Sequence, residues 1–336
     1  MPGKITIIAE AGVNHNADPA LLKEMIHAAK EAGADYVKFQ TAVPELVISS
    51  MAPKATYQKE QTGDGESQLE MCRKLHFPID FYEEVKEMCS KVGIGFLSTP
   101  FDILSLRFLL KLGMDYIKIP SGEITNLPLL REVSQSGIPV ILSTGMSEFH
   151  EVERTVKFLR DHSVGKGKNI TVLQCNTQYP TPYKDVNLRA MVEMGHRLDA
   201  PFGYSDHTPG IEVAIAAGAL GASVIEKHFT MSRDLPGPDH KASLEPSELR
   251  EMIKCIRNVE EAMGGSEKKL TPSERENITV ARKSIVAARD IRKGEVFSYE
   301  NLAVKRPGNG ISPWEIDSVV GKTASRDFPY DSLIEL

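Results

Sequence analysis

Short apolar runs that end in polar or charged residues recur along this chain, and helix-like segments separate them. The first of these runs cover residues 5–10, 35–40 and 115–123. Two later runs, at 205–208 and 226–230, each contain a histidine. In a parallel β/α barrel the residues that follow the strands gather at one face, where the catalytic groups lie. The pattern therefore predicts a barrel with a chemical site at that face.

Further strands and helices complete the alternation. The remaining strands are expected at 94–98, 139–143, 170–175, close to Ser205 and at 223–226, with helices at 20–30, 81–92, 104–112 and 245–263. No glycine-rich dinucleotide-binding motif follows the first strand. Eight strand–helix units in one run favour a closed (β/α)8 TIM barrel over an open, doubly wound sheet.

The organisation of the chain changes after Gly264, where the composition becomes polar and flexible. We expect a catalytic barrel at 1–264, a linker at 265–281, and a small module of short strands and turns at 282–336. So small a module has a thin core, and docking against the barrel or a partner chain would stabilise it. A long polar stretch from 41 to 68 interrupts the barrel pattern and is expected to be a functional loop.

Composition narrows the class of protein. A formal net charge of -6 argues against a nucleic-acid partner or an acidic membrane surface, although a few focused lysines still allow an anionic substrate. No apolar run is long enough to span a membrane, and the first residues lead into a strand rather than a signal peptide. The four cysteines are widely scattered, which favours reduced thiols in a cytoplasmic enzyme.

Two lysines, Lys38 and Lys118, lie within apolar strands, where lysine is a poor structural choice. Because an unpaired buried ammonium group is costly, each should meet an anion. A phosphate or carboxylate ligand is favoured, and an internal salt bridge with Glu10 or Glu123 is the alternative. Serines recur at other strand ends, where their hydroxyls suit phosphate oxygens: Ser98, Ser121, Ser143 and Ser205.

His207 and His228 follow adjacent predicted strands, so their rings can converge on one point. Two imidazoles together with water molecules make a site for Mn²⁺, Mg²⁺ or a similar ion. A satisfied core histidine beside a loop histidine remains the alternative. Glu10, at the end of the first strand, would lie beside the eighth strand in a closed barrel and so bring a carboxylate near this pair.

At this point the chain closely resembles the sialic acid synthases, over essentially its whole length. The motifs that carry the resemblance are IAEAGVNHN (8–16), VKFQT (37–41), LSTPF (97–101), KIPSGE (118–123), STGM (143–146), YPTP (179–182), SDHT (205–208), EKHFT (226–230), PGPD (236–239) and KRPGNG (305–310). The resemblance implies a barrel followed by an antifreeze-like (SAF) domain, in a domain-swapped homodimer. It also implies condensation of phosphoenolpyruvate with N-acetylmannosamine or a related 2-acetamido hexose, giving N-acetylneuraminate and phosphate.

The resemblance also implies roles for individual residues. Phosphoenolpyruvate would be held by Lys38, Lys118, Ser121, Ser143, Thr177 and Ser205. The sugar would contact Gln40, Tyr179, Asp239 and, from the partner chain, Arg306. Glu10, Glu123, Lys38 and Lys118 are the expected catalytic residues. Mn²⁺, or Mg²⁺ or Co²⁺ in its place, would lie on His207 and His228 as the Lewis acid for the sugar aldehyde.

Alternatives remain open. The 41–68 stretch and residues 281–284 depart from the N-acetylneuraminate enzymes, so an N,N'-diacetyllegionaminate synthase using 2,4-diacetamido-2,4,6-trideoxymannose is the main alternative. A Schiff-base aldolase using Lys118 is a second enzymatic alternative. A non-catalytic carbohydrate- or ice-binding protein, dominated by the terminal module, is the alternative from another class.

Overall fold

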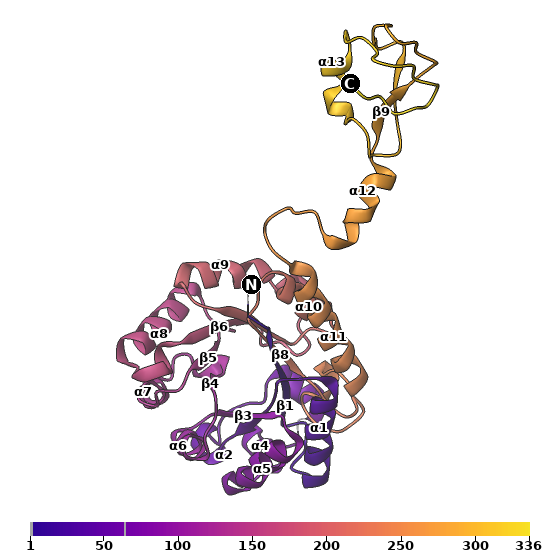
Figure 1. Cartoon of the computed structure of the whole chain (residues 1–336). Coiled ribbons are helices and arrows are strands. Elements are labelled where there is room, and N and C mark those ends of the chain that lie inside the picture. Colours follow the sequence, from indigo (N-terminus) through magenta and orange to yellow (C-terminus); the bar gives the residue numbers. More distant parts are fainter. Residues whose placement is uncertain (1–2, 64) are drawn as a thin grey trace. The chain divides into compact units, whose positions relative to one another are not determined.

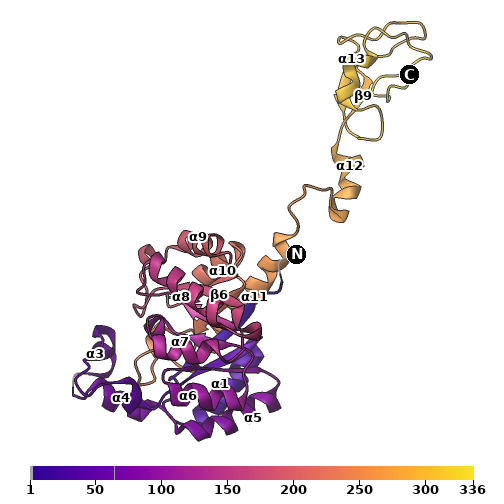
Figure 2. The same ribbon diagram turned by 90° about the vertical axis from the view of Figure 1, so that its left-hand side faces the viewer.

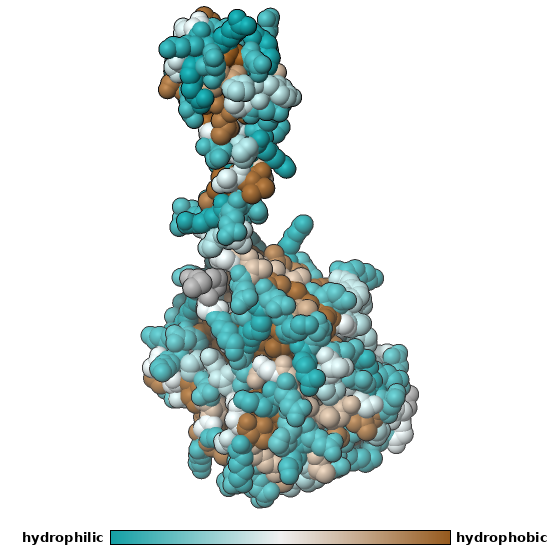
Figure 3. All heavy atoms as spheres, turned by 45° about the vertical axis from the view of Figure 1, so that its right-hand side comes forward, coloured by the Kyte–Doolittle hydropathy of each residue, from teal (hydrophilic) through white to brown (hydrophobic). Residues whose placement is uncertain are grey.

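The protein divides into two compact units, with the boundary between Gly264 and Gly265 (Figure 1). The structure is a computed structural model, and it describes residues 3–63 and 65–336. Within the described residues, no helix has both the length and the apolar character needed to cross a membrane. The face drawn in Figure 3 is mostly hydrophilic, with hydrophobic residues distributed between hydrophilic ones.

The larger unit is a barrel of eight parallel strands. These are β1 (Thr6–Gly12), β2 (Tyr36–Thr41), β3 (Gly95–Pro100), β4 (Ile117–Ile119), β5 (Val140–Ser143), β6 (Ile170–Cys175), β7 (Phe202–Asp206) and β8 (Val224–His228). Hydrogen bonding gives the order β3-β2-β1-β8-β7-β6-β5-β4, and contacts between β3 and β4 complete the ring. The helices surround this ring (Figures 1 and 2). The predicted (β/α)8 fold is confirmed.

The surrounding helices are α1 (Pro19–Ala32), α5 (Tyr82–Val92), α6 (Ile103–Leu112), α7 (Leu127–Ser134), α8 (Phe149–His162), α9 (Leu188–Leu198), α10 (Glu212–Ala219) and α11 (Pro246–Met263). Helix α1 shows why they form where the pattern predicts. Asp18 caps its first turn by accepting a hydrogen bond from Ala20 N at 2.8 Å. Gly33, with φ of 92°, ends it in the left-handed region. Its apolar face, which includes Leu22 and Met25, is buried.

The stretch between β2 and α5 differs from the predicted loop. Its described residues include three short α-helices, α2 (Pro44–Val47), α3 (Thr56–Thr62) and α4 (Gln68–Leu75), and a 3-10 turn at Ile79–Phe81. Figure 2 shows α3 and α4 projecting from the side of the barrel. The sequence did not indicate these helices, because helices of four to eight residues carry too few apolar positions to show a helical period. The functional role expected for 41–68 stays a prediction.

The smaller unit contains α12 (Arg275–Ala281), the antiparallel pair β9 (Ser284–Ala287) and β10 (Leu302–Lys305), and α13 (Ile316–Val319). Its own small core includes Ile285, Phe297, Val319 and Phe328. The segment 265–281, expected to be a linker, belongs to this unit and contains α12 at its end.

Candidate active site

A cavity of about 310 Å³ opens at the carboxyl ends of the barrel strands. Nearly all of the predicted barrel site residues line it: Glu10, Lys38, Gln40, Lys118, Ser121, Ser143, Thr177, Tyr179, Ser205, His207, His228 and Asp239. They come from segments spread over more than two hundred residues of sequence. Because parallel strands all end at the same face of the barrel, closure of the sheet brings these side chains around one space.

Two lysines and two glutamates form the charged floor of this cavity. Lys38 Nζ lies 2.7 Å from Glu10 Oε2 and 3.7 Å from Glu226 Oε1. Lys118 Nζ lies 3.0 Å from Glu226 Oε1. Ser205 Oγ donates a hydrogen bond to the same Glu226 oxygen at 3.1 Å. Lys38 therefore makes the salt bridge with Glu10 that was the alternative to a bound anion. Lys118 pairs instead with Glu226, for which the sequence analysis predicted no role.

Glu226 is that residue, and strand periodicity could have found it. Side chains two apart in a strand point to the same face. Glu226 and His228 therefore both point into the barrel. Lys227, between them, points outward, where its Nζ lies 2.8 Å from Asp206 Oδ2 and donates to Thr208 O at 2.6 Å. The prediction that His228 faces the cavity therefore also implied that the side chain of Glu226 faces it.

The two glutamates have opposite pKa shifts. Burial alone would raise the pKa of Glu226, but Lys118 and Lys38 outweigh it and hold that pKa at about 2. The pKa of Glu10 is raised, mainly by burial, and the negative charge of Glu226 adds to the effect against the attraction of Lys38. Burial opposes the charge of Lys38, yet Glu10 and Glu226 raise its pKa. Glu226 is thus a fixed anion, and Glu10 is the carboxyl suited to proton transfer.

His207 and His228 lie side by side, with ring centroids 5.3 Å apart. His207 Nδ1 donates to Asn176 O at 2.5 Å, and its Nε2 lies 3.0 Å from the Tyr179 hydroxyl. His228 Nδ1 is buried, and the part of the chain that the structure describes offers it no hydrogen-bond partner. Glu10 pairs with His228 in the β1–β8 register, as closure of the barrel predicted.

Both imidazoles are kept neutral. Burial lowers the pKa of His207 to about 4, and it lowers the pKa of His228 as well. Neutral imidazole is the form that binds metal ions. Among residues 3–63 and 65–336, no cluster of three or more His, Cys, Asp or Glu side chains is arranged to hold a metal. The unpartnered His228 Nδ1 and the neutral pair fit a cation whose other ligands are water or substrate.

Aromatic and acidic side chains line the cavity beside the two histidines. Tyr179 stacks on His207 with centroids 4.1 Å apart, and Tyr57 of α3 stacks on Tyr179 at 5.1 Å. Asp239 is deeply buried, and burial followed by the charge of Glu10 raises its pKa to about 7. Gln40 Nε2 donates to Glu10 Oε1 at 3.2 Å. Sequence reasoning missed Tyr57 because it lies within the 41–68 stretch, away from the strand ends from which site residues were predicted.

Side-chain hydroxyl groups also line the cavity. Ser121 Oγ accepts a hydrogen bond from Gly145 N at 2.9 Å and lies 3.1 Å from Cys175 Sγ. A Cβ atom at Gly145 would approach Thr177 Cγ2 to 2.8 Å, so only glycine permits this close packing. Ser143 Oγ is buried, and no described residue hydrogen-bonds to it. A buried hydroxyl in this condition is suited to a ligand oxygen.

Three predicted residues lie outside this lining. Ser98 Oγ is buried against Thr41 Oγ1 at 2.6 Å. Glu123 accepts a hydrogen bond from Asn126 Nδ2 at 2.6 Å, because the turn Ser121–Glu123 directs it toward the start of α7. Arg306 belongs to the smaller unit, where its Nε donates to the Ala281 carbonyl oxygen at 3.2 Å. The roles predicted for Glu123 and Arg306 therefore stay predictions.

A parallel barrel with a charged, histidine-containing cavity at the strand ends, followed by a small second unit, defines the class of protein. The NeuB family model matches residues 25–268, and the SAF domain model matches residues 282–335. The N,N'-diacetyllegionaminic acid synthase of Campylobacter jejuni is 48% identical over 98% of this chain and 99% of its own length. The chain belongs to the NeuB family of sialic acid synthases.

Two further relatives agree with this assignment. The N,N'-diacetyllegionaminic acid synthase of Legionella pneumophila is 43% identical, over 95% of this chain and 90% of its own length. The crystal structure of N-acetylneuraminic acid synthetase from Leptospira borgpetersenii, in complex with citrate, is 33% identical with a TM-score of 0.71. It covers 82% of this chain and 91% of that one.

Proposed function

We propose that this chain condenses phosphoenolpyruvate with the open-chain form of a 2-acetamido hexose, releasing phosphate and a nine-carbon sugar acid. One observation carries the proposal: two lysines, Lys38 and Lys118, and two neutral histidines, His207 and His228, face one cavity. The lysines suit the phosphate and carboxylate of phosphoenolpyruvate. The histidines suit a cation beside the aldehyde.

The charges on the cavity floor support binding of phosphoenolpyruvate at this place. Lys38 and Lys118 both contact Glu226 Oε1, so each is within reach of a negatively charged oxygen at this place. A bound phosphate or carboxylate would share these ammonium groups. Ser143 Oγ, which lacks a partner among the described residues, would donate to a ligand oxygen. Ser121, Thr177 and Ser205 would add further hydroxyl groups.

The reaction would begin when the enol carbon of phosphoenolpyruvate attacks the sugar aldehyde and a carbon–carbon bond forms. The aldehyde oxygen takes up a proton, and water adds to the cationic carbon that carries the phosphate. Cleavage of the bond between that carbon and the bridging oxygen then expels phosphate and leaves a keto acid. Glu10 is suited to transfer these protons because its pKa is raised and it lies in the cavity.

His207 and His228 would hold the divalent cation, with Mn²⁺ expected first and Mg²⁺ or Co²⁺ as alternatives. When bound, such a cation supplies Lewis-acid polarisation of a carbonyl oxygen. The chain itself supplies the orientation, because His207 Nδ1 donates to Asn176 O and Nε2 therefore carries the lone pair. Nε2 lies 3.0 Å from the Tyr179 hydroxyl, and it would exchange that contact for the cation.

The favoured sugar is 2,4-diacetamido-2,4,6-trideoxymannose. Two relatives that cover nearly the whole chain are N,N'-diacetyllegionaminic acid synthases. The apolar part of the cavity lining supports the same substrate. It consists of side chains in or next to α2 and α4, namely Val47, Ile48, Met71 and Leu75. An apolar wall suits two acetamido methyl groups and a C6 methyl group. N-acetylmannosamine is the second candidate, favoured by the similarity to the Leptospira N-acetylneuraminic acid synthetase.

The test is direct. The enzyme is incubated with Mn²⁺, phosphoenolpyruvate and each sugar separately, and phosphate release and product mass are measured. We expect faster turnover with the diacetamido sugar, and an isotope label in the bridging oxygen should leave with phosphate. If neither sugar yields phosphate, the proposed function is wrong. If borohydride traps a covalent adduct on Lys118, the Schiff-base aldolase is correct instead.

We further propose a homodimer in which Arg306 of one chain reaches the sugar in the barrel of the other. Family membership and the small core of the C-terminal unit support this arrangement. A cytoplasmic location is proposed because all four cysteines are free.

A further inference from the structure

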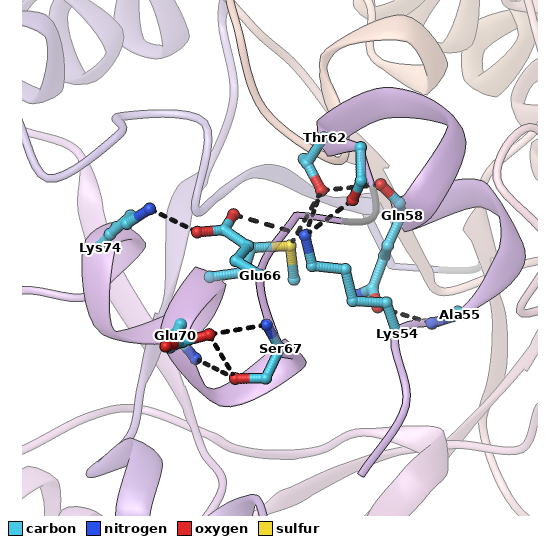
Figure 4. A network of polar contacts seen from close by, with 10 residues as sticks. Lys54, Ala55, Gln58, Thr62, Glu66, Ser67, Glu70 and Lys74 are labelled. Atoms are coloured by element: carbon cyan, nitrogen blue, oxygen red, sulfur yellow. Dashed lines mark hydrogen bonds and ion pairs between the residues drawn. The ribbon is translucent and has the colours of Figure 1, made fainter. Parts of the chain in front are cut away.

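Lys54 is a nearly buried lysine that lies outside the cavity, just before α3. Its side chain is only 2% exposed. Its Nζ donates to Thr62 Oγ1 at 2.9 Å, to the Gly63 carbonyl oxygen at 3.1 Å and to Glu66 Oε1 at 3.4 Å (Figure 4). Because an ammonium group withdrawn from water needs partners, these contacts hold Thr62, Gly63 and Glu66 close to Lys54. The backbone contact lies at the end of α3, where a cation is favourable.

The same network ties α3 to α4. Glu66 also contacts Lys74 of α4 through its other carboxylate oxygen. Ser67 begins α4 by accepting a hydrogen bond from Glu70 N at 3.2 Å, and Glu70 Oε2 accepts one from Ser67 N at 2.8 Å. Figure 4 shows Lys54 pointing between the two helices toward Thr62 and Glu66. Thr62 Oγ1 also donates to Met71 Sδ at 3.6 Å, so the ammonium group of Lys54 and this weaker contact together set the orientation of α3 relative to α4.

These helices form the outer wall of the cavity. Tyr57 and Gln58 of α3, and Gln68, Met71 and Cys72 of α4, all line it. Tyr57 stacks on Tyr179, whose hydroxyl reaches His207 Nε2. Little hydrophobic packing holds this wall, because no residue of α3 is buried and Met71 is the buried residue of α4. A weakly packed element depends strongly on its polar contacts.

We infer that Lys54 is a positioning residue that fixes α3 and α4 as the sugar-side wall of the active site. The inference rests on the proposed function, because it concerns the sugar substrate of that reaction. Lys54 acts through Tyr57 and the stacked Tyr179, and it touches neither substrate. The residues proposed to hold phosphoenolpyruvate lie in or just after the barrel strands, and none of them belongs to α3 or α4.

The test compares Lys54→Met with Lys74→Met. Both remove a lysine that contacts Glu66, but Lys74 is exposed, and exposed ion pairs contribute little. For Lys54→Met we expect the KM of the sugar to rise about tenfold or more, with the KM of phosphoenolpyruvate unchanged. Lys74→Met should match the wild type. Lys54→Arg should recover part of the loss, because it restores the charge.

A merely structural role predicts something else, namely a lower kcat with both KM values unchanged because less enzyme is folded. That result would overturn the inference. Amide hydrogen exchange separates this failure from a failure of the proposed function. In Lys54→Met the amides of α3 and α4 should exchange faster than in the wild type, whatever the substrate is. Unchanged exchange there would also refute the role of Lys54.

Discussion

Replacing Glu226 with glutamine keeps the size of the side chain but removes the negative charge shared by Lys118 and Lys38. The ordinary pKa of this carboxyl is 4.5, and in the folded protein it is about 2. That difference corresponds to about 3 kcal/mol of stability, and breaking a buried ion pair typically costs about 3–5 kcal/mol. We therefore expect Glu226→Gln to lower the free energy of unfolding at pH 7 by about 3 kcal/mol.

The dependence on pH has a definite sign. Because the folded pKa is depressed, the stabilisation is fully present above pH 4.5 and is lost as the pH falls toward about 2. The difference between the wild type and Glu226→Gln should hence be constant from pH 7 to about 5 and narrow below pH 4.5. In a domain of this size the loss lowers Tm by about 6–12 °C.

The assay is urea denaturation followed by far-UV circular dichroism, since the single tryptophan, Trp314, lies in the smaller unit and does not report on the barrel. Glu132→Gln is the matched control, because Glu132 pairs with Arg107 on the surface at 2.8 Å. It should change stability little. If Glu226→Gln is as stable as Glu132→Gln at pH 7, the reasoning from the buried charge cluster is wrong.

Three further predictions follow from the site. His228→Ala should lose Mn²⁺ binding, measured by calorimetry, together with turnover, while its circular dichroism spectrum stays that of the wild type; unchanged turnover would contradict the metal site. Asp239→Asn should be more stable than the wild type at pH 8, because a pKa raised from 3.8 to about 7 makes ionisation of the buried carboxyl unfavourable to the fold; this advantage should shrink steadily as the pH falls from 7 toward 3.8, denaturation at about pH 5 and pH 8 measures it, and an advantage that is equal at both would count against it. Arg306→Ala and His228→Ala should each be nearly inactive, and mixing them should restore activity by forming one intact site per dimer; no recovery after subunit exchange would argue against the cross-chain role of Arg306.

Much of the barrel could be predicted because its signals are local. Apolar runs of strand length, the helices between them and the polar residues at strand ends lie within short windows of sequence. The rule that parallel strands end at one face then placed Glu10 beside His228, which the β1–β8 register confirms. Short helices such as α3 escaped prediction because seven residues carry too few apolar positions to show a helical period, and a helix this short depends on side-chain contacts such as that of Lys54 with Thr62.

The sequence by itself determined which chemical groups could face the cavity, because alternation along each strand assigns Lys38, Lys118 and His228 to the interior. Only the tertiary structure decided how those groups pair. Glu226 meets Lys118 across 108 positions of sequence, and Glu123 turns away to Asn126. The physical reason is that charge–charge energies depend on separation and on burial in a low dielectric, and both quantities exist only once the strands have closed into a ring.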